Sequence, residues 1–149
     1  MKFISHRGNI DGPNPKLENT KHYIDEAIRL GYDVEVDVWY TDDVLYLGHD
    51  KPQYGVEFRW FRDRITKLWV HCKNIEVLLY FKDCGYPINY FWHEEDTITL
   101  TSNGSIWAYP GKQPIKDSIA VMPEIYNDNI YKCAGICSDK IEYYKNELK

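Results

Sequence analysis

Apolar and polar positions follow two different spacings in the first part of the chain. Residues 33–38, DVEVDV, alternate between an acid and a valine. This pattern is typical of a strand, because successive side chains point to opposite faces. A helical spacing of apolar residues instead lies between Thr20, a suitable N-cap, and Gly31, a suitable helix terminator. The chain is therefore predicted to begin as strand, helix, strand.

Eight short apolar segments are predicted strands, each bounded by turn-forming residues. They are KFIS (2–5), VEVDV (34–38), LWVHC (68–72), INYFW (88–92), TITLT (97–101), IWAYP (106–110), SIAVM (118–122) and AGICS (134–138). Further helices are predicted over residues 75–84 and 140–149, and residues 56–67 suggest a short helical turn with a loop.

Strands that alternate with helices indicate a parallel sheet, and eight strands suggest a closed barrel. A (β/α) barrel usually needs about 250 residues, whereas this chain has 149. We therefore expect one domain over residues 1–149, an α/β protein built as a small, irregular TIM-type (β/α) barrel with shortened or missing helices. An open α/β sheet is the alternative.

Composition excludes several classes of protein. Hydrophobic residues make up 44% of the chain and aromatic residues 15%, which argues against disorder. The formal net charge is -5 without a basic run, so no nucleic-acid partner is expected. There is no apolar run of the roughly 20 residues that a membrane span needs, and the polar start does not resemble a signal peptide. We expect a soluble, cytoplasmic protein.

The four cysteines give little support to a structural zinc site. Cys133 and Cys137 are separated by three residues, and the chain contains no C-x-x-C pair. Reduced, packed thiols are the preferred interpretation.

Ionisable residues gather where the predicted strands end, which is where barrel enzymes place their active sites. The residues concerned are His6, Arg7, Glu35, Asp37, His49, Asp50, His71 and Lys73. Glu35 and Asp37 share one face of their strand. On an open sheet that face would meet solvent, whereas inside a barrel two adjacent carboxylates would need a cation.

Four motifs add a resemblance to a known family. HRG (6–8), ENT (18–20), EVDVWYTDD (35–43) and GHD (48–50) occur in the order, and near the spacing, seen in glycerophosphodiester phosphodiesterases. That family belongs to the phospholipase C-like phosphodiesterases, which are TIM barrels. The likeness is close over residues 3–50 and weak between about 75 and 130, so the chain resembles a compact, divergent member.

The resemblance assigns roles to individual residues. His6 and His49 match the catalytic histidines, Arg7 and Lys73 match phosphate-binding residues, and Glu35 and Asp37 match ligands of a divalent metal, usually Mg²⁺ or Ca²⁺. His71 stands where the family usually has a glutamate ligand. It is interpreted as a ligand or as a hydrogen-bonded neighbour of the site. A histidine nitrogen suits Mn²⁺ or Zn²⁺ better than Ca²⁺, and Glu124 is an alternative source of the missing oxygen.

Other residues carry weaker expectations. Trp107, as a substrate-binding residue, and Tyr109 would line the mouth of the site or pack in the core. Asp50 would orient His49 or the backbone, and Asn19 would approach the metal or stabilise its loop. His93 and the acids after it are interpreted as a charged loop rather than as a second metal site.

The resemblance implies a metal-dependent phosphodiester hydrolase that acts on a glycerophosphodiester or a related small phosphodiester. A histidine pair suits proton transfer, because the unperturbed histidine pKa is about 6.5. The alternative is a catalytically inactive binding module for a phosphorylated ligand on the same barrel. The expected partner is a small phosphodiester, with no expectation about oligomeric state.

Overall fold

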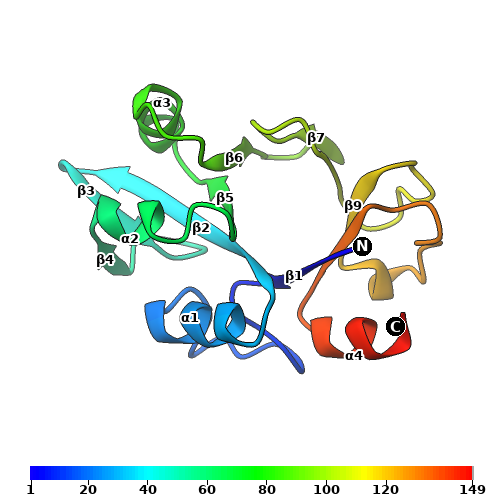
Figure 1. Ribbon diagram of the computed structural model, residues 1–149. Coiled ribbons are helices and arrows are strands. Elements are labelled where there is room, and N and C mark those ends of the chain that lie inside the picture. The colour runs from blue at the N-terminus through cyan, green and yellow to red at the C-terminus, as the bar shows by residue number, and fades with distance from the viewer. Residues whose placement is uncertain (149) are drawn as a thin grey trace.

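The computed structural model describes residues 1–148. Within that range it contains ten strands, four short α-helices and one 3₁₀ helix (Figure 1). In chain order they are β1 (Lys2–His6), α1 (Lys21–Arg29), β2 (Asp33–Thr41), β3 (Val44–Leu47), β4 (Tyr54–Val56), α2 (Phe58–Arg62), β5 (Leu68–Cys72), α3 (Ile75–Asp83), β6 (Asn89–Trp92), β7 (Ile98–Leu100), β8 (Ile106–Ala108), β9 (Ser118–Val121), η1 (Pro123–Ile125), β10 (Gly135–Ser138) and α4 (Ile141–Glu147).

All strands belong to one mixed sheet that curves into a half-barrel. Its parallel part has the order β6-β5-β2-β1-β10-β9-β8. Strand β7 pairs antiparallel with β8, and the hairpin of β3 and β4 extends the far end of β2. Each of the eight segments expected to be strands contains one, while β3 and β4 are additional.

The expectation of a TIM-type (β/α) barrel is wrong. A TIM barrel closes eight parallel strands and follows each with a helix, but the described chain forms a half-barrel with four short helices. Strands β6 and β7 approach through individual hydrogen bonds, such as Ser102 N–H to the Tyr90 carbonyl at 2.7 Å, rather than through a ladder. The physical reason is length, since the connections after β6 and β7 are too short to contain helices.

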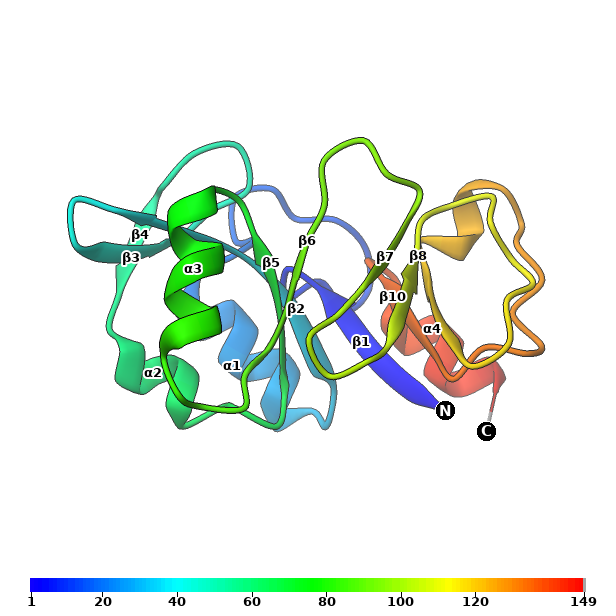
Figure 2. The same ribbon diagram turned by 90° about the horizontal axis from the view of Figure 1, so that it is seen from above.

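Strand β2 separates two layers of packing. Val34, Val36 and Val38 are fully buried in an apolar core that also contains residues of helices α1, α2 and α3. These three helices lie on the side of the molecule that carries β2 and β5 (Figure 2). Glu35 and Asp37 are also buried, but on the opposite, concave face of the sheet. The alternation in the sequence therefore places apolar residues outside and acids inside the half-barrel.

The concave face has its own apolar floor. It consists of Ile4, Trp69, Phe91, Trp107, Ile119, Val121 and Cys137. Trp107 packs against Phe91 with ring centroids 4.8 Å apart and against Trp69 at 5.6 Å. This floor closes the lower part of the interior, so the polar residues lie above it at the carboxyl ends of the strands.

The predicted helices form with small changes in their bounds. Helix α1 begins after Thr20, the predicted N-cap, and buries Ile24 and Ala27. Helix α3 is capped by Asn74, whose side chain accepts the Val77 N–H. Among residues 1–148, no helix combines the length and apolar character that crossing a membrane requires. The four cysteines carry free thiols.

Candidate active site

One cavity of about 520 Å³ opens at the carboxyl ends of the parallel strands. Its lining comes from six strands, β1, β2, β5, β6, β8 and β9, and from loops that follow the strands. The residues are His6, Arg7, Glu35, Trp39, His49, Asp50, His71, Lys73, Trp92, His93, Glu94, Trp107, Tyr109 and Val121. The lining therefore contains His6, Arg7, Glu35, His49, His71, Lys73 and Trp107 of the expected site residues, and Asp37 lies next to it, grouped with Glu35 and His71.

Glu35, Asp37 and His71 form a compact group with the donor set of a cation site. One ligand atom from each lies within 4.8 Å of the others, and all three residues are buried. His71 Nδ1 is 3.1 Å from Asp37 Oδ1 and 3.7 Å from Glu35 Oε1. Parallel pairing of β2 with β5 creates this arrangement, because Asp37 and His71 are register partners.

Two contacts on the side away from the acids fix the ring of His71. Its ring stacks on Phe91 at a centroid distance of 5.1 Å, and Nε2 lies 3.4 Å from the backbone carbonyl of His93. A histidine ligand commonly donates its second ring N–H to a carbonyl, which directs the other nitrogen to the metal. The surroundings of His71 therefore suit an Nδ1 ligand.

Basic and amide groups contact Asp37 on its remaining sides. Arg7 Nε lies 3.0 Å from Oδ2, and Lys73 Nζ lies 3.8 Å from Oδ1. Asn19 donates its side-chain N–H to Oδ2 at 2.9 Å and accepts the Asp37 backbone N–H at 3.0 Å. Asn19 thus positions the acid and its loop, which was one of the two expectations for it.

The conformation of the turn after β1 directs the side chain of Arg7 toward Asp37. Arg7 and Asn19 both have positive φ, 56° and 60°, which is uncommon for residues other than glycine. Two backbone hydrogen bonds hold this conformation, from Arg7 N–H to the Glu35 carbonyl at 3.0 Å and from Asn19 N–H to the Arg7 carbonyl at 3.1 Å. The HRG and ENT motifs are therefore joined to each other and to β2.

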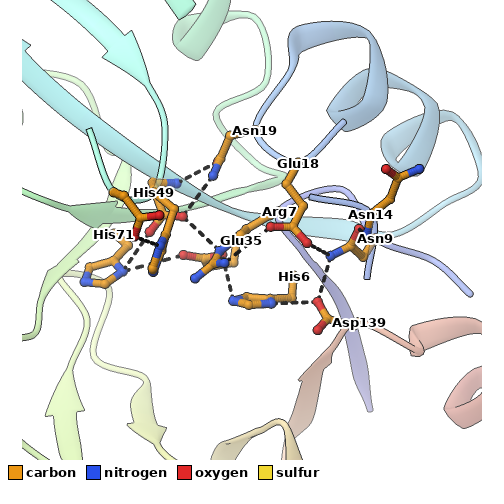
Figure 3. Close-up of polar contacts among 12 residues, drawn as sticks. His6, Arg7, Asn9, Asn14, Glu18, Asn19, Glu35, His49, His71 and Asp139 are labelled. Carbon is orange, nitrogen blue, oxygen red and sulfur yellow. Dashed lines mark hydrogen bonds and ion pairs between the residues drawn. The ribbon is translucent and has the colours of Figure 1, made fainter. Parts of the chain in front are cut away.

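His6 lies at the base of the cavity between two carboxylates. Its Nδ1 is 2.7 Å from Asp139 Oδ1, and its Nε2 is 3.8 Å from Glu35 Oε2 (Figure 3). Asn9 also donates to Asp139, at 2.8 Å. Burial by itself lowers the pKa of His6, but the hydrogen bond to Asp139 and the charge of Glu35 outweigh it, so that the pKa is raised.

His49 approaches the cavity from the loop after β3. Its Nδ1 is 2.7 Å from Asp50 Oδ1, so Asp50 contacts the imidazole, which was one of the two expectations for it. Burial lowers the pKa of His49, the nearby charge of Asp37 opposes this, and the net direction is downward. The two histidines thus reach one cavity from different elements, and their pKa values are shifted in opposite directions.

The buried acid pair fits a bound cation. Burial and the neighbouring charge of Asp37 raise the pKa of Glu35. Burial would also raise the pKa of Asp37, but contact with His71 and the charge of Arg7 lower it strongly. Glu35 Oε2 is buried and has no hydrogen-bond partner among the described residues. A divalent ion would satisfy that oxygen and neutralise the pair.

Glu124, the alternative metal ligand, lies elsewhere. Its Oε1 accepts the Ser138 hydroxyl at 2.7 Å, and its Oε2 accepts the Tyr144 hydroxyl at 3.2 Å. Glu18 accepts hydrogen bonds from Arg7 at 3.4 Å and from Asn9 at 2.9 Å. Trp107 lines the cavity and is also packed in the apolar floor, and its role in substrate binding stays a prediction.

The sequence analysis did not identify Asp139, and it did not assign His93 to the site. Asp139 follows the last strand, and a polar residue at that position is the signal that identified His6 and His71. His93 was interpreted as part of a charged loop, but it lines the cavity and stacks on Tyr109 with centroids 3.8 Å apart. It too directly follows a strand, β6, so the same signal applied.

Comparison with protein-family models, curated proteins and solved structures finds no match to this chain.

Proposed function

We propose that this protein is a metal-dependent phosphodiester hydrolase that acts on a glycerophosphodiester or a related small phosphodiester. The observation that carries the proposal is the convergence of two histidines, an acid pair with a third histidine, and two basic side chains on one cavity. The order of the HRG, ENT, EVDVWYTDD and GHD motifs, which resembles glycerophosphodiester phosphodiesterases, supports the same reaction.

The charges of the site suit a phosphodiester anion. Arg7 and Lys73 line the cavity and would bind the non-bridging oxygens of the phosphate. Glu35, Asp37 and His71 would hold the divalent cation, which supplies Lewis-acid stabilisation of the charge that develops on phosphate. Asn19 keeps Asp37 in place for this task.

The two histidines would perform the proton transfers. One imidazole removes the proton of the attacking hydroxyl or water, while the other donates a proton to the leaving alkoxide oxygen. Steps of this kind each contribute about 10²–10⁴-fold. His6 and His49 each have a carboxylate on Nδ1, Asp139 and Asp50. The Nε2 of His6 faces Glu35 Oε2 at 3.8 Å, next to the proposed metal site, and the Nε2 of His49 would face the substrate.

Hydrolysis assays test the proposal directly. Bis(p-nitrophenyl) phosphate and glycerophosphocholine are incubated with the protein and Mg²⁺, Mn²⁺ or Ca²⁺, and the reaction is then treated with EDTA. We expect metal-dependent turnover that EDTA abolishes and that both His6→Ala and His49→Ala reduce by at least about 10²-fold. His22→Ala is the matched control, because His22 is exposed on α1 outside the cavity.

A second outcome would favour the binding module. If the folded protein binds phosphate esters without metal and without turnover under all three metal conditions, the enzymatic proposal is wrong. Equal turnover by wild type and by both histidine variants would also contradict it.

A further inference from the structure

The side chain of His49 is more exposed than that of any other proposed catalytic or metal-binding histidine, and its direct partner Asp50 is almost fully exposed. The side-chain exposures are 40% for His49 and 91% for Asp50, compared with 17% for His6. A hydrogen bond to so exposed a carboxylate orients a ring weakly, because water competes for both groups. The position of His49 must therefore come from its backbone.

The backbone before His49 is attached to β2 at both of its polar groups. Gly48 N–H donates to the Asp37 carbonyl at 3.1 Å. The Gly48 carbonyl accepts the indole N–H of Trp39 at 2.7 Å. The strand that carries both acids of the proposed metal site thus also holds the Gly48 backbone next to His49.

The backbone at Gly48 does not accommodate a residue with a side chain. Its φ is +149°, and a Cβ atom there would collide with the Lys51 carbonyl oxygen. The chain folds back closely behind Gly48, since Gln53 N–H donates to the Leu47 carbonyl at 3.0 Å. The bond from Trp39 therefore acts on a loop whose remaining backbone is already constrained.

Trp39 reaches this carbonyl because of its place on β2. It lies two residues after Asp37 on the same face of the strand, and it lines the cavity together with His49. We infer that Trp39 is a positioning residue for His49, which through Gly48 sets the distance between this imidazole and the acid pair. The inference rests on the proposed function, because it assigns Trp39 a task in that reaction.

Trp39→Phe tests the inference, because phenylalanine keeps an aromatic wall and removes the N–H donor. We expect kcat to fall about 10-fold or more, as loss of one partly buried hydrogen bond and a small misplacement of His49 predict. KM and metal affinity should change less than about twofold, because Arg7, Lys73 and the acid pair are untouched. Trp60→Phe is the matched control, since Trp60 lies on α2 and its indole N–H has no partner among the described residues.

A double variant separates positioning from general damage. If Trp39 acts only through His49, the pair Trp39→Phe and His49→Ala is no slower than His49→Ala alone. Multiplying defects would overturn the inference, as would an unchanged kcat in Trp39→Phe.

A measurement without substrate keeps this result distinct from the proposed function. Amide hydrogen exchange at Gly48 and His49, followed by NMR, should accelerate at least fivefold in Trp39→Phe and remain unchanged in Trp60→Phe. If wild type shows no turnover, the proposed function fails, and exchange alone decides whether Trp39 holds the loop. Unchanged exchange in Trp39→Phe would overturn its positioning role.

Discussion

His6 and His49 face the same cavity from two very different parts of the molecule. His6 ends β1 in the middle of the sheet, and its partner Asp139 has a side chain that is only 12% exposed. His49 lies on a loop at the rim, where the side chain of its partner Asp50 is 91% exposed. The comparison shows that one site can hold one imidazole through side-chain contacts in the interior and the other through the backbone of a loop.

The largest effect on turnover is expected from substitution of Glu35, which lies between His6 and His71. Glu35→Gln removes a charge that faces both His6 and His71, so turnover should fall by about 10³-fold or more and metal-dependent stabilisation should disappear. A thermal-shift assay with Mn²⁺ and the hydrolysis assay measure the two effects. Asp33→Asn is the control, because Asp33 shares this face of β2 but binds Lys2 and Lys67 instead. A metal-induced shift that survives in Glu35→Gln would contradict the proposed ligand set.

The two aspartate partners should differ in importance. Asp139→Asn removes the negative charge of the buried partner of His6 Nδ1, and we expect kcat to fall about 10- to 100-fold. Asp50→Asn removes the charge of an exposed partner, and kcat should change less than about threefold. Steady-state kinetics of both variants measures the contrast. Equal defects would show that burial of the partner does not distinguish the two histidines.

The third histidine of the site, His71, should decide which metal is bound. His71→Glu replaces a nitrogen ligand by an oxygen ligand, and we expect relative affinity to move about tenfold toward Ca²⁺ or Mg²⁺ and away from Mn²⁺. Calorimetric titration of each ion measures the change. An unaltered order of affinities would mean that His71 is a neighbour of the metal rather than a ligand.

The smallest effect concerns the pH dependence of stability in the presence of a chelator. The pKa of His6 is raised in the folded chain, so its contribution to stability is complete below about pH 6.5 and is lost as pH rises through the raised value. The pKa of His49 is lowered, so its contribution has the opposite slope. Asp139→Asn should therefore weaken the decline of stability above pH 6.5. Urea unfolding at several pH values measures it, and an unchanged decline in this variant would refute the assignment to His6.

Local patterns predicted much of the site. The alternation of acid and valine on β2 placed Glu35 and Asp37 opposite the apolar core, and it required only the period of a strand. Polar residues at the ends of β1, β2 and β5 predicted a common rim, because parallel strands end on the same side of a sheet. The rule does not specify which strands are neighbours, so the pairing of β2 with β5 that brings His71 to Asp37 is a finding of the structure.

The rest depended on contacts between distant segments. Asp139 meets His6 because β10 pairs with β1, a parallel register that no local pattern encodes. The prediction of a closed barrel was wrong for a related reason. A closed barrel requires a ladder of backbone hydrogen bonds between β6 and β7, and the pattern of a single strand does not specify its neighbours. The role of Trp39 depends on one hydrogen bond across a hairpin, which spacing does not reveal.

Anomalous X-ray diffraction from crystals soaked in Mn²⁺ tests the central claim most directly. The account predicts one strong peak among Glu35, Asp37 and His71, with His6 and His49 facing it from two sides of the cavity. A peak elsewhere on the protein, or none while the three side chains remain in contact as described, would contradict it.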